Sequence, residues 1–279
     1  MNAESITALG GTGKTGRRVA RLLLADGYVV KAASRRGSTR FDWADEGSWA
    51  DAVTGASAVY IVPDESPSGT DRLATFTRRA VDSGVRRLVL LSAREWVDTG
   101  YADGLAREEV VRSSGTAWTI LRPVWFAQNF SEEPFLADGV TEGELVFGTG
   151  DGRHPFIDAE DIAAVAAAAL TQDRHHGHEY ELTGPKAITI TEAVEIIAAE
   201  LGRSILTHAA TAAEYWAFLT GRYYSEEGAD GSVAMSEFIR NGNDARLSDG
   251  VQRALGREPR DFTAYTRRCT RGSRGTPDR

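Results

Sequence analysis

The sequence lacks the features that mark several classes of protein. Its only cysteine is Cys269, so the chain can form no internal disulfide and can hold no cysteine-rich metal site. The alanine-rich run over residues 162–170 is far too short to cross a bilayer. The formal net charge is −8, whereas nucleic acids and anionic membranes both require a basic face. We therefore expect neither kind of partner.

The start of the chain also leaves no room for a targeting segment. An apolar run that suits a first strand, residues 6–9, follows within a few residues of the N-terminus, so we expect no signal peptide. A single cysteine suits a reducing compartment, which predicts a cytoplasmic protein. The hydrophobic content of 42% over 279 residues is ample for a sizeable core, in one large domain or in two.

The chain is organised around a glycine-rich stretch between the apolar run 6–9 and residues 17–24, whose apolar side chains recur at helical spacing. The stretch reads Gly10-Gly11-Thr12-Gly13-Lys14-Thr15-Gly16. In a strand, turn and helix of this kind, glycines permit a tight turn, an approach of backbone to a pyrophosphate, and close packing of helix on strand. The helix N-terminus then faces the phosphates. A phosphate loop ending in Gly-Lys-Thr would need glycine at Ala8, so the dinucleotide fingerprint is favoured.

The residues after the second expected strand, 28–33, indicate which dinucleotide binds. They are Ser34, Arg35 and Arg36, and no acidic residue is present to accept a hydrogen bond from a free ribose 2′-hydroxyl. A serine hydroxyl and a guanidinium suit a 2′-phosphate instead. The sequence therefore predicts NADP(H) as cofactor. The alternative is that the two arginines only solvate a turn.

Asp42 and Trp43 follow a short third strand, and two interpretations of them stay open. An aspartate can accept from the adenine amino group, and a flat apolar side chain can cover the adenine ring. Alternatively, Trp43 is a core residue and Asp42 caps the helix that contains Trp49.

Further apolar strands alternate with helices along the first half of the chain. Strands are expected at residues 58–63, 87–92 and 118–123, and helices at 70–83 and 107–115. This order predicts parallel βαβ units, in which ligands lie beyond the carboxyl ends of the strands. The expected fold class is α/β, a Rossmann-type doubly wound parallel sheet with a smaller, mostly helical C-terminal substrate lobe. Val62, Pro63 and Ser92 fall at the carboxyl ends of their strands.

The pattern loosens after Val124. An aromatic segment and a stretch rich in glycine and acid, residues 139–152, suit a substrate cover more than a core element. Thr189 and Glu192 form a capping-box pattern before a helix that Gly202 is placed to end. We predict an NADP-binding domain of residues 1–124 and about 156–182, a substrate-binding lobe of about 125–155 and 183–268, and a disordered tail of 269–279.

Several motifs together resemble the NmrA-like branch of the atypical short-chain dehydrogenases/reductases. They are the stretch 10–16, Ser34-Arg35, Leu91-Ser92, Arg122-Pro123-Val124-Trp125-Phe126-Ala127-Gln128-Asn129 and Phe156-Ile157-Asp158-Ala159-Glu160-Asp161-Ile162-Ala163. The resemblance covers nearly the whole chain. Residues 41–49, 243–247 and 249–251 look most like the ergot-alkaloid-reductase-like members. The family implies two lobes and NADP(H); some members reduce quinones, imines or iminium ions, and others only sense the nicotinamide redox state.

One departure from the family pattern concerns acid/base chemistry. Short-chain dehydrogenases usually carry a Tyr-x-x-x-Lys dyad, in which lysine lowers the pKa of the tyrosine. Here Leu105 stands four residues after Tyr101, so the usual pair is absent and carbonyl chemistry by that mechanism is disfavoured. The glutamate that the family carries on the following helix falls at Glu108, with no catalytic role assigned. Ser92 and Tyr101 remain the catalytic candidates.

The expected site residues fall into two groups. For the cofactor they are Gly10, Thr12, Gly13, Lys14, Thr15, Gly16, Ser34, Arg35, Asp42, Trp43, Val62, Pro63, Ser92, Pro123 and Phe126. For the substrate they are Trp96, Tyr101, Trp125 and Asn129. The aromatic side chains among them favour a flat, apolar substrate, although each one alone also suits ordinary packing.

Other polar residues have simpler interpretations. The histidines at 175, 176 and 178 lack a carboxylate pattern and suggest a loop, so no metal is expected. His154 precedes a proline at a strand start and is interpreted as structural. Asp158 and Asp161 precede an apolar helix, where the cap and the helix dipole favour aspartate.

These features favour an NADPH-dependent reductase that transfers hydride to an activated small molecule. The expected acceptors are a quinone, an imine or iminium ion, or an enone, including intermediates of natural-product biosynthesis. Such acceptors need no enzyme-donated proton before hydride transfer, so the protein would mainly supply proximity and orientation. The alternatives are a non-catalytic NADP(H) redox-sensing regulator and a Rossmann fold reused for non-redox biosynthetic chemistry.

Overall fold

The computed structural model describes residues 5–273, and the side chains of residues 5–269. The chain forms two compact units, each of which collects segments that are distant in sequence. The sheet unit comprises Met1–Val124, Ala159–Leu182 and Asp249–Arg257, and the helical unit comprises Trp125–Asp158, Thr183–Ser248 and Glu258–Arg279. No helix within residues 5–273 is both long enough and apolar enough to span a bilayer.

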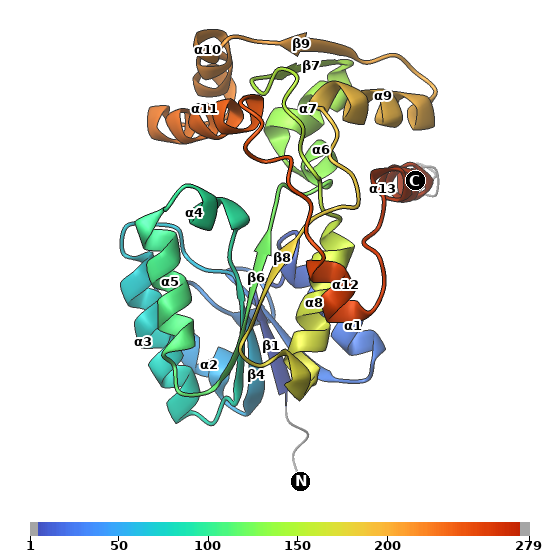
Figure 1. The fold of residues 1–279 in the computed structure, drawn as a ribbon. Helices are drawn as coiled ribbons and strands as arrows, with labels where there is room; N and C mark the ends of the chain where they lie inside the picture. Colours follow the sequence, from blue (N-terminus) through green and yellow to red (C-terminus); the bar gives the residue numbers. More distant parts are fainter. Residues whose placement is uncertain (1–4, 274–279) are drawn as a thin grey trace. The chain divides into compact units, whose positions relative to one another are not determined.

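The sheet unit is built on seven parallel strands in the order β3-β2-β1-β4-β5-β6-β8 (Figure 1). Their bounds are β1 Ser5–Leu9, β2 Val29–Ser34, β3 Thr39–Arg40, β4 Ala56–Ile61, β5 Arg87–Leu91, β6 Ala117–Pro123 and β8 His178–Leu182. The chain starts at the centre and winds outward in both directions, with β1 and β4 adjacent where the direction reverses. This is the doubly wound Rossmann-type sheet that the sequence predicts, and ligands of such sheets bind at that reversal.

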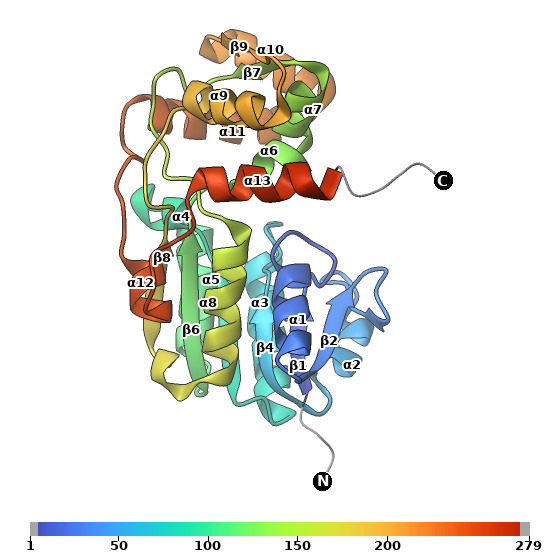
Figure 2. The ribbon, with the colours of Figure 1, turned by 90° about the vertical axis from the view of Figure 1, so that its right-hand side faces the viewer.

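Helices cover both faces of this sheet. The helices are α1 Gly16–Ala25, α2 Trp49–Val53, α3 Gly69–Asp82, α4 Arg94–Asp98, α5 Ala102–Arg112, α8 Ala159–Thr171 and α12 Gly250–Leu255, with short 3-10 turns at Glu46–Ser48 and Asp173–His175. On one face α1 and α8 lie side by side, and α12 packs against α8 (Figures 1 and 2). On the other face α3 packs against α5. The sequence does not predict α4, which is a single short turn after β5.

The core of the sheet unit lies between the strands and the layer of α2, α3 and α5. Trp49, Val59, Phe76, Leu88 and Ile120 are all completely or almost completely buried there. The strands contribute nearly continuous apolar runs because both of their faces are covered. The core therefore fixes the strand ends, and with them the loops that follow each strand.

The helical unit packs around an aromatic core. Its helices are α6 Asn129–Glu132, α7 Pro134–Glu142, α9 Ile190–Leu201, α10 Ala212–Arg222, α11 Glu226–Arg240 and α13 Phe262–Ser273, and β7 Glu144–Phe147 pairs in parallel with β9 Leu206–Ala209. The predicted capping box is confirmed, because the Thr189 hydroxyl accepts from the Glu192 N–H and the Glu192 carboxylate accepts from the Thr189 N–H. Gly202 ends α9 at a φ of 69°, as predicted.

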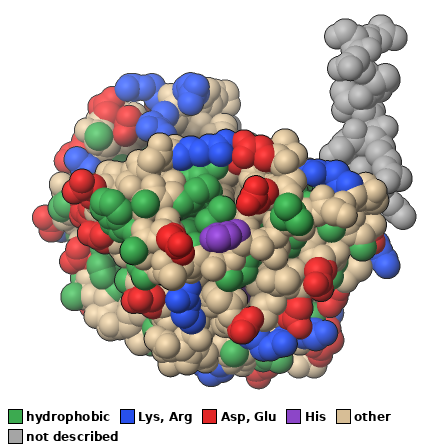
Figure 3. Space-filling model, turned by 90° about the horizontal axis from the view of Figure 1, so that it is seen from above, with side chains coloured by type: hydrophobic (Ala, Val, Ile, Leu, Met, Phe, Trp, Pro, Cys, Tyr) green, Lys and Arg blue, Asp and Glu red, His purple; other side chains and the backbone are tan. Residues whose placement is uncertain are grey.

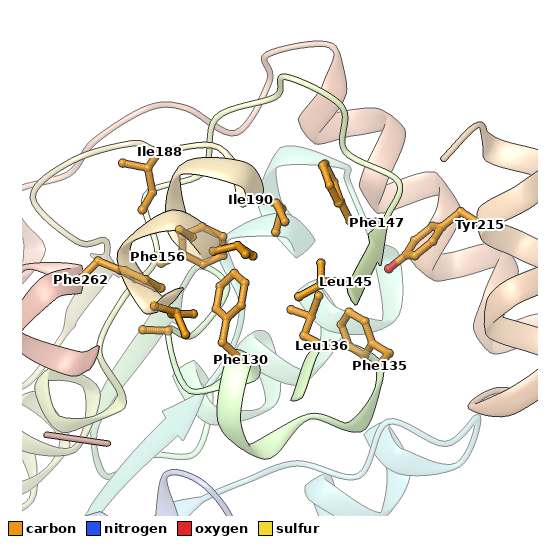
Figure 4. Close-up of a cluster of buried hydrophobic side chains, with 14 of the residues drawn as sticks. Phe130, Phe135, Leu136, Leu145, Phe147, Phe156, Ile188, Ile190, Tyr215 and Phe262 are labelled. Atoms are coloured by element: carbon orange, nitrogen blue, oxygen red, sulfur yellow. The ribbon is translucent and has the colours of Figure 1, made fainter. Parts of the chain in front are cut away.

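The expectation that residues 139–152 form a cover more than a core element is wrong. Leu145 and Phe147 of β7 are buried in the same cluster as Phe130 and Phe156 (Figure 4). The glycines in this stretch allow close packing and a turn instead of a loose loop. A Cβ at Gly139 would lie 2.8 Å from the carbonyl oxygen of Glu144, so only glycine lets α7 approach β7 this closely.

The surfaces of the helical unit are of ordinary composition. The face that carries α10 and β9 mixes hydrophobic, acidic and basic side chains (Figure 3). Leu206 of β9 is 67% exposed, and single exposed side chains of this kind are common. The segment 269–279, expected as a disordered tail, begins inside α13, because the helix that buries Phe262 and Tyr265 continues to Ser273. Residues 274–279 lie outside the described part of the chain.

Candidate functional site

The glycine turn between β1 and α1 is tightly constrained. Gly10 has a φ of +64°, and its carbonyl oxygen accepts from the Gly13 N–H at 2.7 Å. A Cβ at Gly16 would lie 2.3 Å from that same oxygen, and a Cβ at Gly11 would lie 2.6 Å from the backbone of Ala32. The first glycine therefore supplies the left-handed turn, and the other two allow α1 and β2 to approach it. The N–H groups of Arg17, Arg18 and Val19 are bonded within this first turn, and the positive end of the α1 dipole there suits a phosphate.

The turn opens into a cleft of about 580 Å³ within the sheet unit. The cleft is lined by Gly10, Thr12, Gly13, Ser34, Arg35, Arg36, Phe41, Asp42, Trp43, Ala44, Val62, Pro63, Asp64, Glu65 and Arg72. Nine of the residues expected to hold the cofactor are among these. The structure thus brings together the ends of β1, β2 and β4, which the sequence predicts on the shared carboxyl edge.

The remaining residues of the glycine stretch do not line the cleft. Thr15 and Gly16 are buried beneath the turn, and the carbonyl oxygen of Lys14 accepts from Arg18 at 2.6 Å. Burial raises the pKa of the Tyr60 hydroxyl on β4, which has no hydrogen-bond partner among the described residues. These residues hold the turn from below and do not form its open surface.

One corner of the cleft carries unpaired donors. The Ser34 hydroxyl is buried and has no hydrogen-bond partner, and a Cβ at Gly37 would lie 2.7 Å from its oxygen. Arg35 and Arg36 are exposed and form no hydrogen bond or ion pair among the described side chains. A hydroxyl and two guanidiniums around one corner fit a phosphate group, as the NADP(H) prediction requires. The arginines also belong to a turn, closed by the Gly37 N–H on the Ser34 carbonyl at 3.3 Å.

Trp43 is a residue of the core edge that also lines the cleft. Its ring packs edge-on against Phe41 at 4.9 Å and Phe76 at 5.3 Å between ring centres, so it belongs to the edge of the core. Its indole N–H donates to the Val62 carbonyl at 3.0 Å, and the residue still lines the cleft. The core therefore holds this ring in place at the cleft wall.

Asp42 does not cap the helix that contains Trp49. Its carboxylate accepts from the Ala44 N–H at 3.0 Å, within its own turn. Asp45 caps the 3-10 turn Glu46–Ser48 that precedes that helix, where it accepts from the Gly47 N–H at 3.1 Å. The sequence shows both aspartates, and only the turn geometry decides which of them faces the helix.

The opposite wall of the cleft carries a fixed ion pair. Arg72 donates to the Asp64 carboxylate at 2.6 Å, and the Ser66 hydroxyl donates to the same oxygen at 2.8 Å. Burial opposes ionisation of Asp64, but these hydrogen bonds outweigh it and hold the pKa of that carboxyl below its ordinary value. The negative charge of Asp64 is thus already neutralised within the wall. The sequence contained no motif that identified Asp64, Glu65 or Arg72.

Beyond β5 and β6 the sheet unit holds a buried ionic network, centred on Glu108. The Ser92 hydroxyl donates to the Glu108 carboxylate at 2.6 Å, and Arg122 donates to it with two nitrogens at 2.8 and 2.6 Å. Arg112 donates to it at 2.6 Å, and Glu179 pairs with both arginines. Burial alone would raise the pKa of Glu108, but the hydrogen bonds from Arg122 and Ser92 keep it below its ordinary value.

This network determines what the Ser92 hydroxyl can do. Its proton points to an ionised carboxylate, so the oxygen is left with lone pairs that accept hydrogen bonds. Ser92 therefore has no proton to give to a substrate while Glu108 is ionised. Sequence spacing could place Glu108 and Arg112 four residues apart on one helix, but not Ser92, which follows β5, or Arg122 of β6.

Tyr101 and Trp96 lie together in the sheet unit. Their ring centres are 6.2 Å apart, and Tyr101 is 42% exposed whereas Trp96 is buried. A Cβ at Gly104 would lie 2.4 Å from the Trp96 ring, so this indole packs directly on α5. The chain has three lysines, at 14, 31 and 186, and none stands four residues after a tyrosine.

The other expected residues are divided between the units. Pro123 ends β6 in the sheet unit, whereas Trp125, Phe126 and Asn129 are half-buried residues of the helical unit. His154 accepts from the Trp125 N–H at 2.9 Å through Nε2, and its Nδ1 pairs with the buried Asp244. These contacts agree with the structural role expected of His154.

The remaining polar candidates also have partners inside their own unit. Asp158 pairs with Arg268 in the helical unit, and Asp161 pairs with Arg257 at 2.6 Å in the sheet unit. Burial lowers the pKa of His175 to about 4, and its Nδ1 lies 2.9 Å from the Tyr180 hydroxyl. Among the described residues no group of three or more histidine, cysteine or acidic side chains is placed to hold a metal ion.

Comparison with known proteins identifies the family. Residues 10–173 match the model of the NAD(P)H-binding family. The chain is 32% identical over 276 residues to the uncharacterized oxidoreductase YesF of Bacillus subtilis, covering 95% of both chains. It is 32% identical over 277 residues to agroclavine dehydrogenase of Claviceps fusiformis, covering 94% of this chain and 96% of that enzyme. The chain belongs to the NAD(P)H-binding family, and the predicted kinship with ergot-alkaloid dehydrogenases is confirmed.

Solved structures share the same fold. Triphenylmethane reductase of Citrobacter sp., determined with NADP(H), superposes with a TM-score of 0.75 at 20% identity, covering 95% of this chain and 99% of that one. A mutant of NmrA superposes with a TM-score of 0.73 at 16% identity, covering 99% of both chains. These likenesses establish the architecture over nearly the whole chain.

Proposed function

We propose that this chain is an NADPH-dependent reductase that transfers hydride to an already activated small molecule: a quinone, an imine or iminium ion, or an enone. The observation that carries the proposal is the cleft of the sheet unit, with its glycine turn and the unpaired donors Ser34, Arg35 and Arg36. Relatives of the chain are named as agroclavine and festuclavine dehydrogenases, which supports redox chemistry on a small molecule.

The cleft residues fit the cofactor in three places. The turn from Gly10 to Gly16 offers backbone N–H groups to a pyrophosphate. The corner of Ser34 and Arg35 suits the 2′-phosphate, so NADPH is preferred to NADH. Asp42 and Trp43 line the cleft where an adenine ring would meet a carboxylate and a flat side chain. Pro63, Ser92, Pro123 and Phe126 are assigned to the nicotinamide.

NADPH held in this cleft would supply a hydride to the electrophilic atom of the substrate, so that the substrate would be reduced and the nicotinamide oxidised. The protein's own residues contribute orientation and a dry environment. Ser92 accepts hydrogen bonds, because its proton is held by Glu108. Tyr101 lacks the lysine that would make it an acid, so an acceptor that needs no proton before hydride transfer is favoured. Trp96, Tyr101, Trp125 and Asn129 are assigned to the substrate.

A redox-sensing regulator is the second candidate. The Ser92 hydroxyl is engaged by Glu108, and the Tyr-x-x-x-Lys dyad is missing. Both features also suit a protein that binds the cofactor without turning over a substrate. Reuse of the fold for non-redox biosynthetic chemistry is a third possibility. Screening NADPH oxidation against quinones, imines and enones separates these candidates. Turnover supports the reductase, whereas tight NADP⁺ binding without turnover supports the sensor.

Cofactor preference is tested by Arg35→Ala, with Arg78→Ala as the matched control, since Arg78 is exposed on α3 and does not line the cleft. Loss of a charge-assisted hydrogen bond to the 2′-phosphate costs about 1.5–3 kcal/mol, so the Kd for NADPH should rise roughly 10- to 100-fold. The Kd for NADH should stay the same, and Arg78→Ala should change neither. Equal weakening of both cofactors would refute the 2′-phosphate assignment.

A further inference from the structure

The helical unit contains a pocket of its own, lined by no residue of the cofactor cleft. Its volume is about 190 Å³, and its walls come from α6, α7, α9 and α13. The lining residues are Phe130, Ser131, Ala137, Val140, Thr141, Ile197, Leu201, Tyr265, Thr266 and Cys269. All of them belong to the helical unit, and they are collected from three separate stretches of sequence.

The walls of this pocket are mostly apolar. Phe130, Val140, Ile197 and Leu201 supply aromatic and aliphatic surface, and Ala137 leaves room between α7 and the other helices. A cavity of about 150 Å³ with such walls is large enough to bind benzene. The pocket therefore accommodates a single aromatic ring with a small substituent.

Among the polar lining groups, most hydroxyl protons are already used. The Tyr265 hydroxyl donates to the Ser131 oxygen at 3.0 Å, and the Ser131 hydroxyl donates to the Gln128 carbonyl at 3.3 Å. The hydroxyls of Thr141 and Thr266 donate to backbone carbonyls of their own helices at 2.9 Å. What these groups still offer is lone pairs, so an occupant has to bring the hydrogen-bond donor.

The polar end of the pocket is also neutral. Burial raises the pKa of both Tyr265 and Cys269, so each keeps its proton at neutral pH. The neighbouring arginines are engaged elsewhere, because Arg268 pairs with Asp158 and Arg267 with Glu200, and the nearby Glu132 adds a negative charge that disfavours an anionic occupant. A charged occupant would lose hydration in the pocket without gaining a counter-ion from it.

From the volume, the apolar walls and the free lone pairs, we propose that this pocket binds a neutral, single-ring aromatic molecule that carries a hydrogen-bond donor, such as a phenol. This site is additional to the proposed reductase function and does not depend on it. The ring would fill the space beside Ala137 and Phe130, and the donor would face the oxygens of Tyr265 and Ser131.

Cys269 provides a direct assay, because it lines the pocket and is the only cysteine in the chain. The rate of its alkylation by N-ethylmaleimide is measured on the full-length protein against increasing phenol, with Cys269→Ser as the blank. Saturable protection by phenol is expected. Anisole has the same ring without a donor and should bind about fivefold to tenfold more weakly, as expected for one lost hydrogen bond. Benzoate, a charged ring, should not protect.

Two variants locate the effect. Ala137→Phe fills the pocket and should abolish protection, whereas Ala213→Phe introduces the same ring on the exposed face of α10 and should keep it. An unchanged far-UV circular dichroism spectrum and a cooperative urea transition verify that each variant is folded. Tyr265→Phe should bring the affinities for phenol and anisole together. The proposal is overturned if phenol gives no saturable protection, if Ala137→Phe is still protected, or if benzoate protects as well as phenol.

Discussion

The carboxyl edge of the sheet uses arginine in two different ways. Beyond β2, Arg35 and Arg36 are exposed and have no partner among the described side chains. Near the end of β6, the Arg122 side chain is 12% exposed and is tied to Glu108. An exposed guanidinium keeps its hydration and stays available to an incoming anion, whereas a buried one requires a counter-ion inside the protein.

Arg35 and Arg36 thus stay available to a ligand, whereas Arg122 is fixed inside the fold. Ser34 and Ser92 follow the same division. The Ser34 hydroxyl has no partner at the cleft corner, whereas the Ser92 hydroxyl is bound to Glu108. Residues of the same type at the ends of different strands of one sheet therefore differ in their bonding because of the charges packed around them. Substitutions in the buried network and at the cleft test this difference.

The largest effect is expected for Glu108→Gln. The carboxylate is fully buried, and its removal leaves Arg122 with Glu179, and Arg112 with Glu179 and the exposed Glu109. Breaking a buried ion pair from one side costs about 3–5 kcal/mol, so the free energy of unfolding should fall by that amount. Urea denaturation measures the loss.

The matched control is Glu109→Gln, one residue further along the same helix. Its side chain is 68% exposed and pairs with Arg112 at 3.5 Å, so the change should stay within about 0.5 kcal/mol. Similar small losses for both variants would mean that the network contributes no more than a surface ion pair.

The second largest effect concerns packing under the glycine turn. In Gly16→Ala the new Cβ would lie 2.3 Å from the Gly10 carbonyl oxygen, so backbone has to move. Overpacking of this kind costs about 1–3 kcal/mol and should also weaken NADPH binding. In Gly13→Ala the same oxygen lies 3.2 Å away, and the loss should be smaller. If Gly13→Ala proves the more damaging for stability, the close approach at Gly16 is not what constrains the turn.

The pH dependence of stability follows from Glu108. Its pKa is lowered in the folded protein, so the unfolded chain binds more protons just below the ordinary value of about 4.5. The stability that Glu108 contributes is present above that value and is lost as pH falls through the lower, folded pKa. The slope is at most about 1.4 kcal/mol per pH unit for one proton. Below pH 5, the free energy of unfolding should change less per pH unit in Glu108→Gln than in the wild type.

The smallest effects are expected for the two candidate catalytic residues. Ser92 has no proton to give and Tyr101 has no lysine beside it, so Ser92→Ala and Tyr101→Phe should each lower kcat less than about tenfold, or 1.4 kcal/mol, on a substrate that is turned over. kcat and KM are determined separately. A loss of about a thousandfold in kcat for Tyr101→Phe would reveal a proton donor and a different mechanism.

The cofactor side of the sheet could be predicted from sequence because its signals are local. The glycine turn, Ser34 and Arg35 stand within a few residues of the strands that position them, and strand order then collects them in one cleft. The capping box of Thr189 and Glu192 was predictable for the same reason. Patterns of this kind depend on backbone geometry that neighbouring residues determine themselves.

The buried network and the pocket of the helical unit depend on distant residues instead. Glu108, Arg122 and Glu179 lie on a helix and two strands, and each alone reads as an ordinary surface charge. The core role of Leu145 and Phe147 was missed because the glycines around them suggest a loop. In these places tertiary packing overrides the local sequence pattern. Spacing along the chain does not show which distant residues come into contact.

The order of the segments has a consequence for synthesis on the ribosome. Every residue that lines the cofactor cleft lies between Gly10 and Arg72, so its walls emerge early. The sheet unit closes much later, when α12 arrives and packs against β8 so tightly that a Cβ at Gly250 would lie 1.9 Å from the Glu181 carbonyl oxygen. Between these events Arg122 of β6 has to avoid ion pairs with other acidic residues. The ion pair of Arg122 with Glu179 can form only after the first part of the helical unit has been made.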